Sequence, residues 1–195
     1  LISRLDRYIW EQAAAKLGEW KKVGINMSIS VNISPKDFYY IDIFNTFAGL
    51  VKKYDIEPSN LKIEITETTI MSDVPNLMGE LEELRKAGFT IEMDDFGSGY
   101  SSLNTLKDIN VDVLKVDMGF IKETKNVKKS RIILASVIKM AKELNLLIIT
   151  EGVETEEQVD NLTKLGCDVF QGYYFSKAID VNEFEKRYLY RKKAG

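Results

Sequence analysis

Short apolar segments typical of buried β-strands alternate along the chain with longer segments of helical periodicity. Side chains of a strand point alternately to its two faces, and six segments show this period of two. They span residues 25–34, 61–67, 89–95, 111–117, 146–152 and 168–175. Strands that alternate with helices favour parallel pairing through right-handed crossovers, in a doubly wound open sheet or in a barrel.

The segments between these strands carry the start and stop signals of helices. The first keeps apolar residues at helical spacing from Ile2 to Trp20 and ends at Gly24, and Pro35 begins the next. The predicted helices cover residues 2–24, 35–54, 72–87, a short stretch after Ser101, 127–144, 155–165 and 181–190.

A barrel is favoured over an open sheet because the polar residue of nearly every strand falls near the carboxyl end of that strand. In a (β/α)8 barrel these ends converge on one mouth, where such folds place their chemistry. The residues are Asn32, Glu64, Asp94, Lys115 with Asp117, Glu151 and Gln171. Eight strands close such a barrel, so we expect two more upstream of Leu1 and interpret residues 1–195 as one α/β domain that lacks its N-terminal strands.

The composition limits the compartment and the partners. Thirty acidic and 27 basic residues give a net charge of -3, so the chain has no basic field that would hold a long nucleic acid. Cys167 is the single cysteine and excludes an internal disulfide. No apolar run reaches the roughly 18 residues of a membrane span. We expect a cytoplasmic domain without direct membrane insertion, although upstream domains of a full-length protein could tether it to a membrane.

The predicted strand at residues 89–95 ends in two adjacent carboxylates, Asp94 and Asp95, and a loop with two glycines follows. Thr90, Glu92 and Asp94 share one face of this strand. Taken alone, two neighbouring acids at a strand end more often form a solvated turn than a metal site. The polar residues of the other strands decide between these interpretations.

At a common mouth these strands would present four carboxylates and one amide, and the chain contains no histidine. Oxygen ligands of this kind suit Mg²⁺ or Mn²⁺, and the number of acids suits two ions. The ligands are Asn32, Glu64, Asp94, Asp95 and Glu151. Paired divalent ions favour in-line attack of water on a phosphodiester, and Lys115 could position that water or stabilise the transition state. The pattern therefore predicts hydrolysis of a phosphate ester.

Each of these residues also has a purely structural interpretation. Asn32 and Gln171 could be hydrogen-bonding residues of a barrel interior, and Glu64 could pair with a lysine. Lys115 could pair with Asp117 two residues on, and Glu151 with Glu154 could be acidic residues at a helix start. Together these interpretations do not explain why successive strands carry a polar group at the same position. The Asp-Phe-Gly triplet also occurs in protein kinases, but no glycine-rich loop or His-Arg-Asp loop accompanies it.

Six motifs along the whole chain resemble the EAL domain, the bacterial module that hydrolyses cyclic di-GMP to linear pGpG and so terminates second-messenger signalling. They are VNIS with Asn32, EITE with Glu64 and Glu67, DDFGSGYSS with Asp94 and Asp95, LKVD with Lys115 and Asp117, EGVET with Glu151 and Glu154, and QGYYFSK with Gln171.

This resemblance implies a modified (β/α)8 barrel and a cyclic-guanylate-specific phosphodiesterase that uses Mg²⁺ or Mn²⁺. The ions would be held by Asn32, Glu64, Asp94, Asp95 and Glu151. Lys115 would orient or activate water, and Glu151 would hold an ion or act as the general base, two roles that the resemblance does not separate. Glu67 would steady the DDFGSGYSS loop, Gln171 would lie near substrate, and Asp117 and Glu154 would support the site. The loop borders the dimer contact in this family, which implies a homodimer.

The chain departs from the family pattern in two places. The Glu-Ala-Leu signature, with a glutamate that binds metal and an arginine that meets substrate, is absent from these residues and is expected upstream of Leu1. Ala178 stands where the family tends to have proline. A catalytically inactive EAL domain that acts as a cyclic di-GMP receptor or protein-interaction module is therefore the main alternative to the enzyme. A third interpretation, an unrelated barrel enzyme acting on a phosphorylated metabolite, requires the order of the motifs to be accidental.

Overall fold

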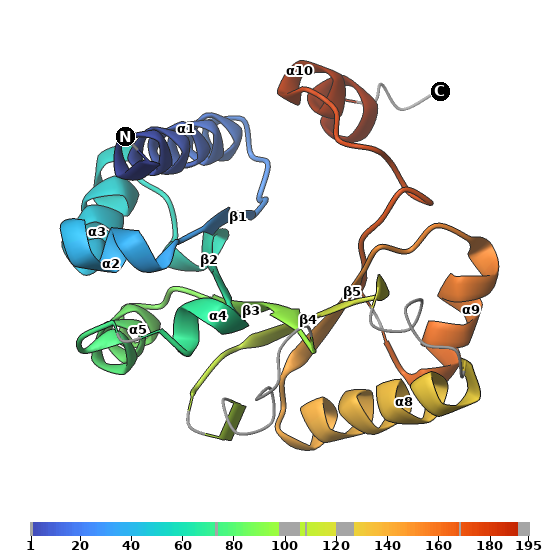
Figure 1. Cartoon of the computed structure of the whole chain (residues 1–195). Helices are drawn as coiled ribbons and strands as arrows, with labels where there is room; N and C mark the ends of the chain where they lie inside the picture. The colour runs from blue at the N-terminus through green and yellow to red at the C-terminus, as the bar shows by residue number, and fades with distance from the viewer. Residues whose placement is uncertain are drawn as a thin grey trace.

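Six parallel strands form one curled sheet in the computed structural model, which describes residues 2–72, 74–97, 106–107, 109–119, 127–167 and 169–190. The strands are β1 (Ile29–Asn32), β2 (Leu61–Thr66), β3 (Ile91–Phe96), β4 (Val113–Asp117), β5 (Leu147–Glu151) and β6 (Val169–Phe170). Each strand pairs with the next one in sequence, as expected of repeated strand-helix units. The predicted six strands and the α/β barrel class are confirmed in the form of a half-barrel (Figure 1).

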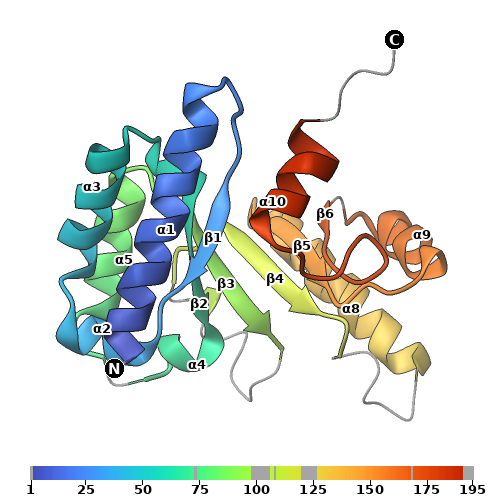
Figure 2. The same ribbon diagram turned by 90° about the horizontal axis from the view of Figure 1, so that it is seen from above.

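Helices cover the convex side of this half-barrel. In Figure 2, α1, α2, α3 and α5 lie beside β1 to β3, and α8 and α9 lie beside the later strands. The helices are α1 (Ile2–Lys22), α2 (Pro35–Tyr40), α3 (Ile43–Tyr54), α4 (Glu67–Ile70), α5 (Leu77–Lys86), α8 (Val127–Glu143), α9 (Glu156–Leu165) and α10 (Val181–Phe184), with a 3-10 turn at Pro58–Asn60 and a π-helical turn at Glu185–Leu189.

The hydrophobic core lies between the convex face of the sheet and these helices. Strand β2 shows the pattern, because Leu61, Ile63 and Ile65 are fully buried on the outer face while Lys62 and Glu64 alternate with them. The same alternation continues in the neighbouring strands, so the concave face carries the polar residues. The fold therefore separates its apolar core from its polar face across a single sheet.

Aromatic rings and one close backbone approach fix helices α1 and α3 to the sheet. The ring of Phe47 lies 5.1 Å from Trp10 and 5.8 Å from Phe89, joining α3 to α1 and to the start of the β3 segment. A Cβ atom on Gly18 would lie 2.8 Å from the carbonyl oxygen of Tyr54, so glycine permits the two helices to approach. These contacts hold α1 and α3 against the sheet.

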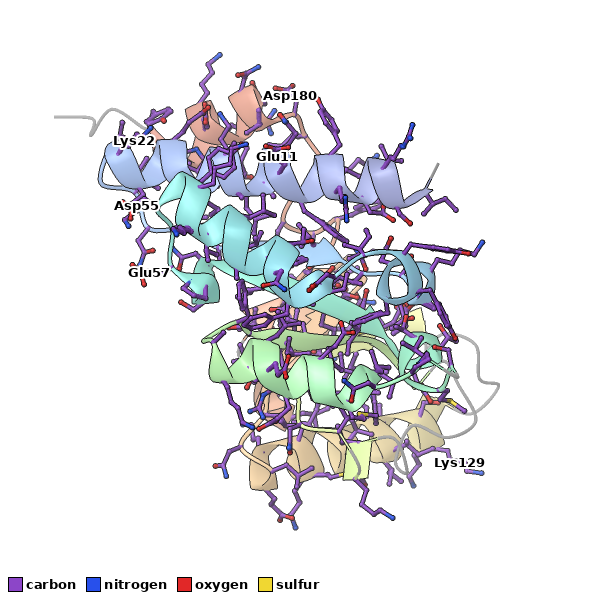
Figure 3. All side chains as sticks on the ribbon, turned by 90° about the vertical axis from the view of Figure 1, so that its left-hand side faces the viewer. Glu11, Lys22, Asp55, Glu57, Lys129 and Asp180 are labelled. Carbon is purple, nitrogen blue, oxygen red and sulfur yellow. The ribbon has the colours of Figure 1, made fainter. Side chains whose placement is uncertain are left out.

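Polar contacts at the surface reinforce the packing of α1 on α3. Glu11 on α1 accepts a hydrogen bond of 3.0 Å from the hydroxyl of Tyr54 and forms an ion pair with Lys53. Figure 3 shows Glu11 on α1 above α3, with Asp55 and Glu57 beyond the end of α3. Because these groups are largely exposed, they stabilise the fold far less than the buried rings do.

Two predicted helices differ from those observed. The predicted helix at residues 35–54 is divided, because Ile41 is extended and the side chain of Asp42 accepts a hydrogen bond of 3.0 Å from the Asn45 amide, which begins α3. The predicted helix at 72–87 begins only at Leu77, after Asn76 in the left-handed conformation. The side-chain cap of Asp42 decides the first boundary and the left-handed backbone of Asn76 marks the second, and hydrophobic periodicity reports neither.

The last predicted strand, residues 168–175, is wrong in length, because β6 ends at Phe170. The chain turns at Gly172, where a Cβ atom would lie 2.1 Å from the Val153 carbonyl oxygen, and the Phe175 amide donates to the Gly172 carbonyl. The predicted short helix after Ser101 lies largely outside the described residues. The predicted helix at 181–190 is confirmed as α10 followed by the π-helical turn.

The end of the described chain returns to its beginning. The indole nitrogen of Trp20 on α1 donates a 2.8 Å hydrogen bond to Glu185, and its ring lies 5.9 Å from that of Phe184. Figure 1 shows α10 near the end of α1, above the open side of the curled sheet. No described helix combines the length and the apolarity that a membrane crossing requires.

Replacement of Phe47 tests the packing of α1 and α3 on the sheet. We expect Phe47→Ala to lower the free energy of unfolding by about 3–5 kcal/mol, because it empties a fully buried site between two aromatic rings. Urea denaturation followed by circular dichroism measures this change. Tyr40→Ala is the control, because Tyr40 is 77% exposed and its loss should change stability by no more than about 0.5 kcal/mol. Equal effects of the two substitutions would contradict this packing.

Candidate active site

Polar residues of five strands meet at the carboxyl edge of the concave face. The parallel register aligns Asn32 of β1 with Glu64 of β2, and Asp117 of β4 with Glu151 of β5. The arrowheads in Figure 2 show that β3 and β4 run towards this same edge. The sequence predicted this arrangement from the position of one polar residue near the end of each strand.

Lys115 is the centre of the cluster. Its ammonium Nζ lies 2.6 Å from Oε1 of Glu64, 2.9 Å from Oε1 of Glu151 and 3.4 Å from Oδ1 of Asp94. The side-chain amide of Asn32 donates a 3.2 Å hydrogen bond to the other oxygen of Glu64. Lys115 is only 4% exposed, so its ammonium is held inside the half-barrel by carboxylates from three other strands.

Burial and mutual charge shift the acid-base properties of these groups. Burial raises the pKa of Glu64 and of Glu151 above the ordinary value, although contact with Lys115 opposes the shift and nearby Asp94 adds to it. Burial alone would lower the pKa of Lys115, but its hydrogen bonds to Glu64 and Glu151 outweigh this effect and raise it. The lysine therefore stays charged, and this one cation faces three acidic side chains.

A β-bulge brings the two adjacent aspartates to this edge. Met93 pairs with Leu114 and Phe96 with Val116, so Asp94 and Asp95 together lie opposite Lys115. Asp95 has a φ of 56° in the left-handed region, and its amide donates a 2.9 Å hydrogen bond to Oδ1 of Asp94. In a regular strand the two carboxylates would point to opposite faces.

Asp117 lies beside this bulge and contributes further negative charge. Burial first, and then the charges of Asp94 and Asp117, raise the pKa of Asp95. Asp117 accepts a 2.7 Å hydrogen bond from the Gly119 amide, and a Cβ atom on Gly152 would lie 3.3 Å from Oδ1 of Asp117. Gly152 has a φ of 71°, so glycine suits the tight turn that follows Glu151.

Three other predicted site residues do not belong to the cluster that Glu64, Asp94 and Glu151 form around Lys115. Glu67 is buried as the first residue of α4, directly after β2, and its predicted partner loop falls at residues 94–102, of which 98–102 are outside the described chain. Gln171 is exposed just beyond β6 and is fixed through its backbone to Thr150 and Val153. Glu154 is exposed before α9. The roles of these three residues stay predictions.

The contacts of Lys115 bear on the purely structural interpretations of Glu64 and of Lys115. Glu64 pairs with a lysine, as its purely structural interpretation predicted. That lysine is Lys115, which also contacts Glu151 and Asp94. Lys115 therefore takes its partners from three other strands and not simply from Asp117 on its own strand. A single shared cation explains why successive strands carry acids at the same level.

Sequence analysis did not identify a second group of polar residues on the concave face. Glu92 is 1% exposed and contacts Ser30 and Lys62. The sequence pattern could have revealed this group, because Ser30, Lys62 and Glu92 each lie two positions before a predicted ligand and therefore on the same face of the strand as that ligand. We call Ser30, Lys62 and Glu92 the lower polar layer.

The donor set fits hard divalent cations in its chemistry, because it offers carboxylate and amide oxygens with excess negative charge. Within the described ranges, no three acidic or cysteine side chains already surround one point as metal ligands would. Glu64, Asp94 and Glu151 instead turn towards the ammonium of Lys115. Binding of an ion would therefore require some of these carboxylates to turn from Lys115 towards the ion.

Fold and site together define an α/β barrel-type domain with an oxygen-rich, acidic site at the carboxyl ends of its strands. The family model described as EAL domain matches residues 1–178. The chain belongs to the EAL domain family.

Known relatives agree in sequence and in structure. The bifunctional diguanylate cyclase/cyclic di-GMP phosphodiesterase MucR of Pseudomonas aeruginosa is 34% identical over 184 residues, which cover 94% of this chain and 27% of MucR. The solved PaMucR phosphodiesterase in complex with c-di-GMP has a TM-score of 0.86 at 34% identity, covering 94% of this chain and 75% of that one. A manganese and cy-diGMP complex of Klebsiella pneumoniae BlrP1 has a TM-score of 0.80 at 29% identity, covering 90% and 44%. The chain spans about a quarter of the length of the first curated relatives it matches.

Substitutions of Asp95 test the bulge. We expect Asp95→Val to lower the free energy of unfolding by about 1–2 kcal/mol, because a β-branched residue is strained at positive φ. Asp95→Asn removes the same charge but tolerates this conformation, so it is the matched control and should stay near wild-type stability. Chemical denaturation in the absence of metal compares the two variants. Equal stability would indicate that residue 95 does not adopt the left-handed conformation.

Proposed function

We propose that this domain hydrolyses cyclic di-GMP to linear pGpG in a reaction that depends on a divalent cation. The observation that carries this proposal is the convergence of Glu64, Asp94 and Glu151 on Lys115 at the carboxyl edge of the strands. Membership of the EAL domain family supports the substrate, since relatives in that family are named cyclic di-GMP phosphodiesterases.

The proposed ligands of the cation are the oxygens of five residues at this edge. They are Asn32, Glu64, Asp94, Asp95 and Glu151. Mg²⁺ or Mn²⁺ suits this set, and the excess of carboxylates over the single lysine suits two ions. When bound, such ions supply a water of lowered pKa and neutralise the charge of the phosphodiester. A manganese complex of the relative BlrP1 supports the choice of metal.

Lys115 and Glu151 have separate proposed roles in the reaction. Lys115 is buried and charged, so once Glu64 and Glu151 turn towards the ions its ammonium can orient the attacking water and stabilise negative charge on the phosphate oxygens. Glu151 lies 2.9 Å from Lys115 at the same edge, so its carboxylate is close enough to accept the proton of that water. Water attacks the phosphorus of one phosphodiester and gives a proton to a base, the bond from phosphorus to the ribose oxygen breaks, and that oxygen takes up a proton to become the free hydroxyl of the linear dinucleotide.

The substrate-facing part of the site is proposed to include Gln171. This residue lies beyond the carboxyl end of β6 and is held by backbone hydrogen bonds of 2.8 Å to Thr150 and 3.1 Å from Val153. These bonds tie the backbone of Gln171 to residues on either side of Glu151, which supports a role beside the acidic edge. Retention of all five proposed ligands together with Lys115 favours hydrolysis over a receptor that only binds the nucleotide.

Metal dependence gives the first test. We expect the full-length protein to hydrolyse cyclic di-GMP with Mg²⁺ or Mn²⁺ and to lose activity in excess EDTA, because the acidic cluster cannot activate water without a cation. Asp94→Asn should lower turnover at least 100-fold, since the amide removes a negative ligand. Chromatographic separation of pGpG from substrate measures both effects. Undiminished turnover in excess chelator would overturn the metal-dependent reaction.

Substitution of Lys115 separates binding from chemistry. We expect Lys115→Met to reduce kcat by at least about 100-fold at saturating metal while cyclic di-GMP affinity stays within about tenfold, because the ammonium acts chiefly on the transition state. Steady-state kinetics and calorimetric titration of the nucleotide give the two values. Lys139→Met removes a lysine that is largely exposed on α8 and should leave both unchanged. Near-normal kcat in Lys115→Met would indicate that Lys115 has a structural role and not a catalytic one.

A further inference from the structure

The lower polar layer repeats the pattern of the proposed ligands one step down the strands. Ser30, Lys62 and Glu92 lie two residues before Asn32, Glu64 and Asp94, respectively. Side chains two residues apart share one face and are separated by about 7 Å along a strand. The lower polar layer therefore lies directly under the proposed metal ligands, on the same three strands β1, β2 and β3.

Glu92 is the residue that joins this layer. One oxygen, Oε2, accepts a 2.9 Å hydrogen bond from the hydroxyl of Ser30, and the other, Oε1, lies 3.0 Å from Nζ of Lys62. The Glu92 side chain is 1% exposed, whereas that of Lys62 is 21% exposed. A carboxylate of β3 is thus bonded at the same time to β1 and to β2.

The contact between Ser30 and Glu92 requires a curved sheet. Strand β2 lies between β1 and β3, so in a flat sheet the two strands would be separated by roughly 10 Å. Side chains on one face of alternate strands approach one another only when the sheet curls towards that face. The 2.9 Å contact therefore fixes the curvature of β1 to β3 on the concave side.

The same curvature determines the spacing of the groups above it. Asn32 and Glu64 are neighbours in the register of β1 and β2 and contact each other at 3.2 Å, whereas Asp94 lies on β3, so the distance between Asn32 and Asp94 across β2 depends on the curl of these three strands. We propose that Glu92 is a positioning residue whose bonds to Ser30 and Lys62 set the separation of the metal ligands Asn32, Glu64 and Asp94. This inference rests on the proposed metal-dependent function.

A purely structural ion pair would respond to substitution differently from a positioning residue. Removal of such a pair would lower the stability of the fold but leave the affinity of the folded protein for metal unchanged. Removal of a positioning residue would weaken metal binding in protein that is still folded. Residues that orient metal ligands typically change metal affinity by about 10- to 100-fold.

Calorimetric titration of Mn²⁺ into the full-length protein, without substrate, tests the inference. We expect Glu92→Leu to weaken Mn²⁺ binding at least tenfold at a temperature where circular dichroism shows native structure. This variant leaves Lys62 without its carboxylate and could fail to fold. The double variant Lys62→Met/Glu92→Leu replaces the pair with apolar side chains of similar size, and we expect the same loss of affinity from it.

Arg85→Leu is the matched control. It removes an ion pair in which Arg85 contacts Asp112 at 2.9 Å, just before β4 at the opposite end of the sheet. We expect lower stability but Mn²⁺ affinity within about twofold of wild type. If wild type binds Mn²⁺ and the double variant binds it equally well, the positioning role is overturned. If wild type itself binds no Mn²⁺, the proposed function is overturned and this inference with it.

Discussion

A buried ammonium shared by three carboxylates is the interaction on which the polar face of this domain depends. Lys115 lies within 3.4 Å of acids from β2, β3 and β5, so these strands must converge at their carboxyl ends. Without that cation, several acids would face one another in a poorly hydrated space, at a large cost in free energy. The curl of the sheet, the bulge in β3 and the tight turn after Glu151 all serve to bring these groups to one place.

Much of the fold and the position of the site could be predicted from sequence. Alternation of strands and helices predicted six parallel strands, and the single polar residue near each strand end predicted where Asn32, Glu64, Asp94, Lys115 and Glu151 would meet. These predictions succeeded because a period of two, together with parallel pairing, leaves little freedom in where a side chain points. The homodimer and the roles of Glu67, Gln171 and Glu154 stay predictions.

Other features depend on geometry that a residue pattern does not carry. The bulge at Asp94 and Asp95 changes the register by one residue, and nothing in two adjacent aspartates distinguishes it from a regular strand end. The early end of β6 follows from the close approach of Gly172 to Val153, which is a contact between distant segments. The pairing of Glu92 with Ser30 depends on sheet curvature and so on all three strands together.

The placement of the hydrophobic core on the convex side has a consequence for how such a domain changes over time. Apolar residues such as Ile63 and Met93 pack against helices, while the acids lie on the other side of the same strands. Loss of one acid therefore leaves the core packing largely intact. Mutations could remove the proposed catalysis while a folded, acidic concave surface persists, and that surface would remain available to selection for binding alone. The architecture of the proposed hydrolase would thus give its descendants a direct route to becoming receptors.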